Sequence, residues 1–277
     1  MAMVTGGGGA QLHVVDAGNP RGRPIVFMHG FSQSWHAWDK QFASDLPSEF
    51  RLIALDLRGH GQSDKPRDGY DDARLWADDL NAVLRELELD RPVLCGWSYG
   101  MLVILDYVRY YGENAIGGIN VVDGISKLGS NEAMAVISPE LRSLVPGLFA
   151  TDVEESVRSL QSLLRLCFAR ALSADELCFM LGYNVVVPPY VRQALFSRSV
   201  DNDDLLPTLR TPVLITHGAV DAAVSPGVVE QHTAAIPHAQ VALMPGAGHA
   251  PFHDDASAFN QRLRSFCASV TSDHRAA

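Results

Sequence analysis

The sequence predicts an α/β fold, in which a mostly parallel sheet is covered by helices on both faces. Short apolar runs of strand length recur along the chain, and amphipathic segments of helical length lie between them. Such continuous apolar runs are typical of strands buried on both faces, and their alternation with helices is typical of a parallel sheet. The alternation stops between about residues 126 and 205, where the patterns are helical only.

The strands are predicted from the apolar runs. Glycines 6–9 suit a turn between two short N-terminal strands, the second covering residues 11–16. The remaining runs cover residues 24–28, 51–55, 92–95, 116–122, 212–216 and 240–244. Helical periodicity predicts the segments that pack on these strands, at residues 72–89, 100–111, 227–235 and 256–270.

The helical stretch predicts an insertion into this core. Capping-box patterns at residues 151–154 and 173–176 each precede an apolar helical stripe, and Pro188-Pro189 opens a third helix. We therefore expect a core of residues 1–125 and 206–277, and a helical cap of residues 126–205. Ligands of open α/β sheets bind at the carboxyl edge of the strands, so we expect the cap to cover that edge.

Composition limits the classes of partner. Hydrophobic residues make up 47% of the 277 residues, charged residues 19%, and the net charge is −10. This balance repels nucleic-acid phosphates and anionic membranes, so neither is an expected partner. The chain has four cysteines without metal-like spacing, no secretory pattern at its N-terminus and no apolar stretch of membrane-spanning length. We expect a cytoplasmic protein with free thiols.

A candidate nucleophile lies in Gly96-Trp97-Ser98-Tyr99-Gly100. This G-x-S-x-G motif follows an apolar strand and precedes a helix, the context in which a sharp turn exposes the serine oxygen above a sheet. The glycines remove Cβ atoms that would collide in the turn. Motif and context together predict that Ser98 is a catalytic nucleophile.

Two backbone amides are candidates for an oxyanion hole. The segment His29-Gly30-Phe31 follows the strand at residues 24–28. We expect the N–H groups of Phe31 and Tyr99 to bind the developing oxyanion. The imidazole of His29 is expected to support this loop and to take no part in catalysis.

Asp221 and His249 complete the predicted catalytic triad. Each lies just after a strand, and the chain order Ser98, Asp221, His249 is that of α/β-hydrolases. Asp123 also ends a strand and is the alternative acid. For His253 we expect a contact with the surface or the cap. No histidine spacing indicates a metal, and we expect neither metal nor cofactor.

The segments HGFSQSWHAW, DLRGHGQSDKP, GWSYG, HGAVD and PGAGHAPF resemble the α/β-hydrolase superfamily. They are most similar to its bacterial esterase and cofactor-free haloperoxidase-like (perhydrolase) branch. The resemblance spans about residues 11–125 and 206–270, and it implies an eight-stranded sheet with a cap after strand six. Dehalogenases and epoxide hydrolases on this fold have an aspartate where this chain has Ser98, so their chemistry is not expected. The glycine-rich oxyanion loop of lipases is also missing.

The expected reaction is hydrolysis of a small to medium apolar carboxylic ester through an acyl-enzyme on Ser98, with water as co-substrate. The substrate-pocket candidates are Trp97, Leu160, Phe168 and Met180. The same triad also serves carbon–carbon bond hydrolases, lactonases, thioesterases and perhydrolases, which the sequence does not separate. A non-catalytic ligand receptor on the same fold is the alternative of another class.

Overall fold

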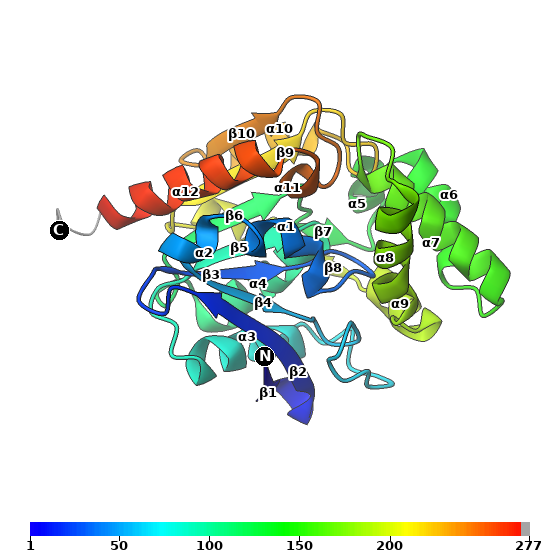
Figure 1. The fold of residues 1–277 in the computed structure, drawn as a ribbon, viewed down its shortest axis with the longest axis horizontal. Helices are drawn as coiled ribbons and strands as arrows, with labels where there is room; N and C mark the ends of the chain where they lie inside the picture. The colour runs from blue at the N-terminus through cyan, green and yellow to red at the C-terminus, as the bar shows by residue number, and fades with distance from the viewer. Residues whose placement is uncertain (273–277) are drawn as a thin grey trace.

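A computed structural model describes residues 1–272 and contains the predicted eight-stranded sheet (Figure 1). The strand order is β1-β2-β4-β3-β5-β6-β9-β10. Strand β2 pairs antiparallel with both β1 and β4, and the other pairs are parallel. The bounds are β1 (Ala2–Thr5), β2 (Gln11–Gly18), β3 (Pro24–Met28), β4 (Arg51–Leu55), β5 (Val93–Trp97), β6 (Gly118–Val122), β9 (Val213–Gly218) and β10 (Gln240–Met244).

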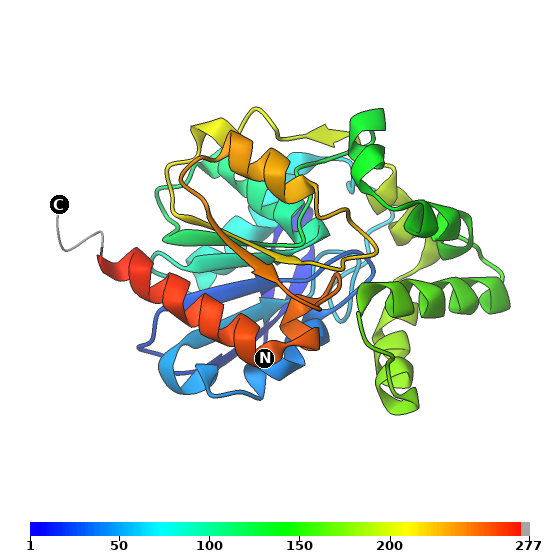
Figure 2. The same cartoon turned by 90° about the horizontal axis from the view of Figure 1, so that it is seen from above.

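Helices cover both faces of this sheet (Figure 2). One apolar core lies between the sheet and α3 (Ala73–Glu86), α4 (Tyr99–Tyr111) and α10 (Val228–Ala235). The opposite core lies beneath α1 (Asp39–Phe42), α2 (Leu46–Glu49) and α12 (Ala256–Ser272), with α11 (Pro251–Asp254) nearby. Short 3-10 turns lie at Gly7–Gly9, Trp35–Trp38 and Leu206–Thr208. Among the described residues, no helix is long and apolar enough to span a membrane.

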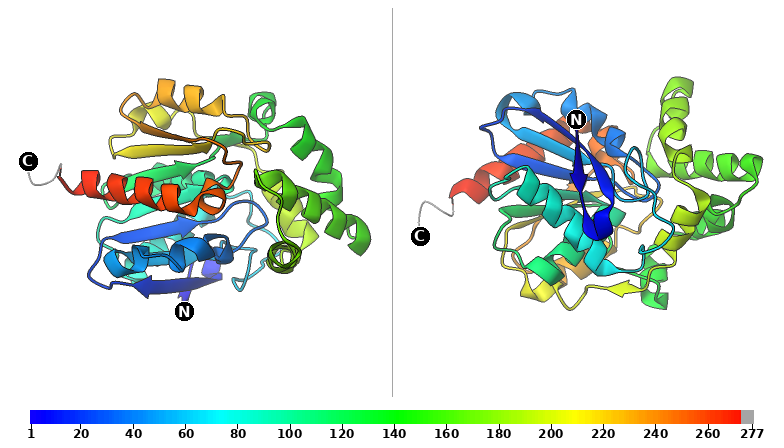
Figure 3. Two further views of the ribbon diagram at one scale, coloured as in Figure 1. Left: turned by 45° about the horizontal axis from the view of Figure 1, so that its top comes forward. Right: turned by 90° about the horizontal axis from the view of Figure 1, so that it is seen from below.

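The stretch from 126 to 205 lies beyond one end of the sheet (Figure 3). It contains α5 (Asn131–Val136), α6 (Pro139–Leu148), α7 (Val153–Cys167), α8 (Ala174–Val185) and α9 (Pro189–Phe196). The expectation of helices alone is wrong, because β7 (Lys127–Leu128) and β8 (Val200–Asp201) pair where the chain leaves and re-enters the core. The capping box of Ser173 and Glu176 is present, whereas α7 is capped by Asp152 and not by Thr151.

A buried arginine joins the helices of this cap. Arg192, on α9, is 2% exposed and has no acidic partner among the described residues. Its guanidinium donates hydrogen bonds to the carbonyl oxygens of Leu148 and Val187, at 2.6 and 2.7 Å, and to the hydroxyl of Ser156, at 2.9 Å. Leu148 is the last residue of α6, Val187 follows the end of α8, and Ser156 lies in α7. The single side chain therefore fixes four helices relative to one another.

We expect Arg192→Met to destabilise the protein by roughly 2–4 kcal/mol, because it leaves buried carbonyl oxygens without donors. Chemical denaturation with a tryptophan-fluorescence readout measures this change in the free energy of unfolding. Arg158→Met is the matched control, since Arg158 is exposed on α7 and its ion pair within residues 1–272 is with the exposed Glu154. Equal stabilities of the two variants would contradict the assigned role of Arg192.

Candidate active site

Ser98 occupies the sharp turn between β5 and α4. Its backbone has φ 52° and ψ −112°, a region that residues other than glycine rarely adopt. The turn ends the strand at Trp97 and begins the helix at Tyr99 without an intervening loop. The Ser98 side chain is therefore held at the carboxyl edge of the sheet, where it is half-buried and accessible from the cavity beneath the cap.

The two motif glycines make this turn sterically feasible. A Cβ atom on Gly96 would lie 2.7 Å from the Ile104 side chain and 2.8 Å from the Gly100 backbone. A Cβ atom on Gly100 would lie 2.7 Å from the Met28 carbonyl oxygen. All three separations are below van der Waals contact, so these glycines permit the turn and the close packing of α4 on the end of β3.

His249 and Asp221 are brought together by the loops after β10 and β9. The His249 Nδ1–H donates a 2.7 Å hydrogen bond to Asp221 Oδ2. The other carboxylate oxygen accepts from the amides of Ala223 and Val224, at 2.7 and 3.0 Å. Burial acts to raise the pKa of Asp221, but His249, His217 and the Val224 amide together outweigh it, so the pKa lies below its ordinary value. Asp221 is thus an ionised acceptor that orients the imidazole.

The alternative acid, Asp123, has a different environment. It is fully buried at the end of β6, and its Oδ1 accepts a 2.8 Å hydrogen bond from the amide of Gly218. No hydrogen bond joins Asp123 to His249 in the described part of the chain. The structure therefore places Asp221, and not Asp123, against the histidine.

Phe31 and Tyr99, whose amides are the predicted oxyanion donors, both lie beside Ser98. Tyr99 is the first residue of α4, so its N–H is one of the donors left free at a helix start. Phe31 lies in the loop after β3, and this loop passes close to the serine, because a Cβ atom on the preceding Gly30 would lie 3.3 Å from the Ser98 Cβ. Both Phe31 and Tyr99 line the cavity that contains Ser98.

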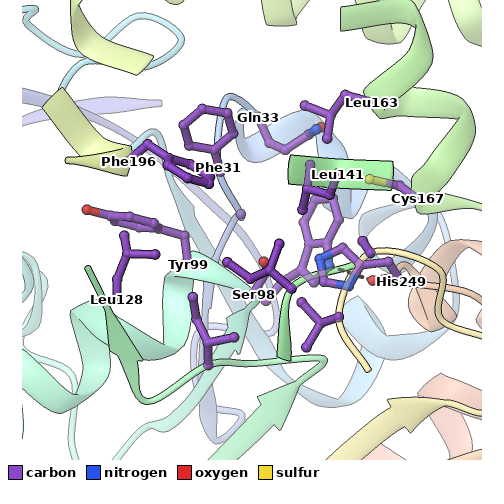
Figure 4. A pocket seen from close by; sticks show the side chains of 16 residues that line it. Phe31, Gln33, Ser98, Tyr99, Leu128, Leu141, Leu163, Cys167, Phe196 and His249 are labelled. Carbon is purple, nitrogen blue, oxygen red and sulfur yellow. Dashed lines mark hydrogen bonds between the residues drawn. The ribbon is translucent and has the colours of Figure 1, made fainter. Parts of the chain in front are cut away.

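The cavity above Ser98 is small and largely apolar, with a volume of ≈ 60 Å³ (Figure 4). Ser98 and His249 lie at its base, Phe31 and Phe196 on one side, and Leu141, Leu163 and Cys167 on the other. The apolar side chains contributed by the cap and its connections are Ile125, Leu128, Ile137, Leu141, Leu163 and Phe196. This volume accommodates a few water molecules or a short acyl group.

The predicted pocket residues are only partly at this cavity. Trp97 lines it, and its indole N–H donates a 2.6 Å hydrogen bond to the His249 carbonyl oxygen. Leu160 and Met180 are buried away from the cavity, and Phe168 packs on His253 with ring centroids 4.8 Å apart. Helix α7 instead reaches the cavity through Leu163, one turn after Leu160, and Cys167.

The other histidines of the motifs have structural contacts. His29 bonds to the Gly30 carbonyl oxygen through Nδ1, and its Nε2 accepts from the amide of Leu57, so the ring braces the loop. Burial lowers the pKa of His29. His253 is buried against the cap by its contact with Phe168, and not at the surface.

Sequence analysis missed three polar residues around the site. His217, on β9, lies with its Nε2 3.4 Å from Asp221 Oδ2. Gln33 is 2% exposed and lines the cavity. Arg198, at the end of the cap, pairs with Asp106 at 2.7 Å and donates to the Tyr99 hydroxyl at 3.2 Å. His217 and Gln33 lie within the segments HGAVD and HGFSQSWHAW, which carry the family resemblance, whereas Arg198 lies in no such segment.

Comparison with known proteins agrees with this geometry. A family model described as alpha/beta hydrolase fold matches residues 23–256. The structure of an esterase from Rhodococcus sp. ECU1013 superposes with a TM-score of 0.91, at 36% identity over 97% of this chain and 98% of that chain.

Curated relatives point to the same branch. A pimeloyl-[acyl-carrier protein] methyl ester esterase of Vibrio atlanticus is 25% identical over 89% of this chain and 95% of its own length. The non-heme chloroperoxidase CPO-A1 of Kitasatospora aureofaciens is 38% identical over 44% of this chain and 42% of its own. These matches confirm the resemblance to the esterase and haloperoxidase-like branch. The chain belongs to the α/β-hydrolase fold family, and its relatives support a hydrolase.

Proposed function

We propose that the protein is a serine esterase that hydrolyses small apolar carboxylic esters through an acyl-enzyme on Ser98. The observation that carries this proposal is the hydrogen bond of His249 to Asp221 at the base of the cavity that Ser98 also lines. A nucleophile, a base and an orienting acid are the minimum set for this chemistry.

In the proposed mechanism, His249 accepts the Ser98 proton as the serine oxygen attacks the ester carbonyl carbon. The N–H groups of Phe31 and Tyr99 stabilise the oxyanion, and the alcohol leaves with the proton from His249. His249 then deprotonates a water molecule that hydrolyses the acyl-enzyme. Tyr99 is well placed for its part, because its amide also begins a helix whose dipole favours negative charge there.

The cavity supports a short, apolar acyl group as substrate. Its lining is almost entirely aliphatic and aromatic, so it favours carbon chains and rings over charged groups. The ≈ 60 Å³ volume suits a short acyl chain better than a long one. The Rhodococcus relative is itself an esterase, which agrees with this substrate class.

Replacement of the nucleophile gives the first test. Ser98→Ala should lower kcat for p-nitrophenyl acetate or butyrate by about 10⁴-fold or more and abolish labelling by a fluorophosphonate. Ser143→Ala is the control, since Ser143 is exposed on α6. A Ser98→Ala variant that keeps its turnover would refute the proposal. If wild type is labelled but cleaves no ester, the substrate class is wrong and the nucleophile stands.

The acid is tested by Asp221→Asn, which should reduce kcat by roughly 10⁴-fold with the fold intact, because an amide can hold His249 in the wrong tautomer. The exposed Asp175 supplies the control Asp175→Asn. Steady-state kinetics together with circular dichroism measure both effects. Near-normal turnover in Asp221→Asn would assign the acid elsewhere.

Acyl-length preference tests the cavity. Leu163→Ala enlarges it, so kcat/KM for p-nitrophenyl hexanoate relative to acetate should rise by about 10-fold, the usual effect of one or two methylenes in an apolar pocket. Leu160→Ala is a matched control on the same helix, because Leu160 is fully buried but does not line the cavity. It should lower stability without changing the ratio. Equal ratios in the two variants would show that substrate binds elsewhere.

A further inference from the structure

A second set of polar groups is buried directly behind the triad acid. It consists of Asp123 at the end of β6 and His217 at the end of β9, and both are almost fully shielded from solvent. The His217 Nε2 lies 3.4 Å from Asp221 Oδ2 and 3.6 Å from Asp123 Oδ1. One ligand-type atom from each of the three side chains lies within 4.8 Å of the other two.

Two acceptor atoms of this cluster have no hydrogen-bond donor, the His217 Nε2 and the Asp123 Oδ2. The His217 ring donates to the main chain of Val224, and its Nε2 has no hydrogen-bond partner. Since the donating nitrogen is therefore Nδ1, a neutral His217 presents only a lone pair at Nε2. Asp123 Oδ2 also has no partner, although the residue is fully buried. With both carboxyl groups ionised, lone pairs would face one another in a site almost fully shielded from solvent, which is strongly unfavourable.

We propose that Asp123 is a positioning residue that stays a neutral carboxylic acid and donates its proton toward Asp221. The one added proton turns an acceptor–acceptor contact into a hydrogen bond, and it leaves Asp221 as the single ionised acid of the pair. His217 Nε2 is the alternative acceptor for the same proton, close to both carboxyl groups. The proposal rests on the serine esterase function, in which Asp221 orients His249.

The electrostatic surroundings support a neutral Asp123. Burial raises its pKa well above the ordinary value, and the neighbouring charge of Asp221 raises it further. The amide of Gly218 acts in the opposite direction and is outweighed. The other titratable groups that face the pair from packed elements are His217, His249, Asp254 and the thiol of Cys167. No lysine or arginine is among these neighbours in the described chain.

A neutral Asp123 does two things for the site. Its Oδ1 accepts from Gly218, the residue at which the loop carrying Asp221 begins, so it fixes the path of that loop. Its proton also gives the Asp221 carboxylate a donor in addition to the Ala223 and Val224 amides. Asp123 itself has a positive φ of 45°, a conformation that aspartate tolerates better than most residues.

Two variants of Asp123 separate this role from simple packing. Asp123→Ala removes the donor and should lower kcat by about 10-fold or more with KM little changed. Asp123→Asn keeps the shape of the neutral acid and a donor, so it should recover most of that loss. The acid limb of its kcat/KM–pH profile should lie within ~0.5 pH unit of wild type. An ionised Asp123 would instead make its removal shift that limb lower by about one unit or more, which would overturn the proposal.

Infrared spectroscopy tests the proton without any turnover, and so it remains informative if the esterase proposal fails. The difference spectrum between wild type and Asp123→Asn at neutral pH should contain the carbonyl stretch of a protonated carboxylic acid, above the amide I band. The same band should be absent from the difference between wild type and Asp175→Asn. Absence of the band from the Asp123 difference would overturn the proposal. Stoichiometric zinc bound by the purified protein and lost in Asp123→Asn would also overturn it, because a cation would then occupy the proton's place.

Discussion

The turn between β5 and α4 is the constraint on which the site depends. It forces Ser98 into a left-handed backbone conformation, and the fold tolerates this only because Gly96 and Gly100 lack side chains. The same missing atoms let α4 approach the end of β3, so the loop with Phe31 comes beside the serine. The packing around Ser98 therefore holds the strained conformation of this residue. The same turn makes the Ser98 hydroxyl accessible from the cavity and brings Phe31 and Tyr99 beside it.

The core and the placement of Ser98, Asp221 and His249 at one sheet edge could be predicted from the sequence because both follow from local rules. Apolar runs gave strand positions within a few residues, and the parallel arrangement makes the carboxyl ends of strands meet at one edge. Ser98, Asp221 and His249 each follow a strand, so their convergence needed no knowledge of distant contacts. The sequence predicted Asp221 as the acid and left Asp123 as the alternative, because both end central strands. In the structure the loop after β9 carries Asp221, and not Asp123, to the imidazole.

The cap shows where local patterns stop being informative. Leu160 and Leu163 belong to one apolar stripe of α7. Periodicity predicts that both are buried, but it does not predict which residues each one contacts. Their difference depends on the rotation of α7, which hydrogen bonds from the buried guanidinium of Arg192 help to fix. Long-range contacts of this kind leave no trace in spacing. The small strand pair at the root of the cap was missed for a related reason, since two-residue strands have no measurable period.

That strand pair has a consequence for how this fold varies. Because β7 and β8 lie side by side, the chain leaves the core and returns to it at adjacent points. An inserted segment of any length therefore starts and ends at the same two neighbouring points of the core. The entropic cost of closing such a loop grows only slowly with its length. Helices could be lost, gained or exchanged between these two points while Ser98, Asp221 and His249 kept their positions at the sheet edge. Substrate preference and chemical competence can therefore evolve as separable traits in a protein built this way.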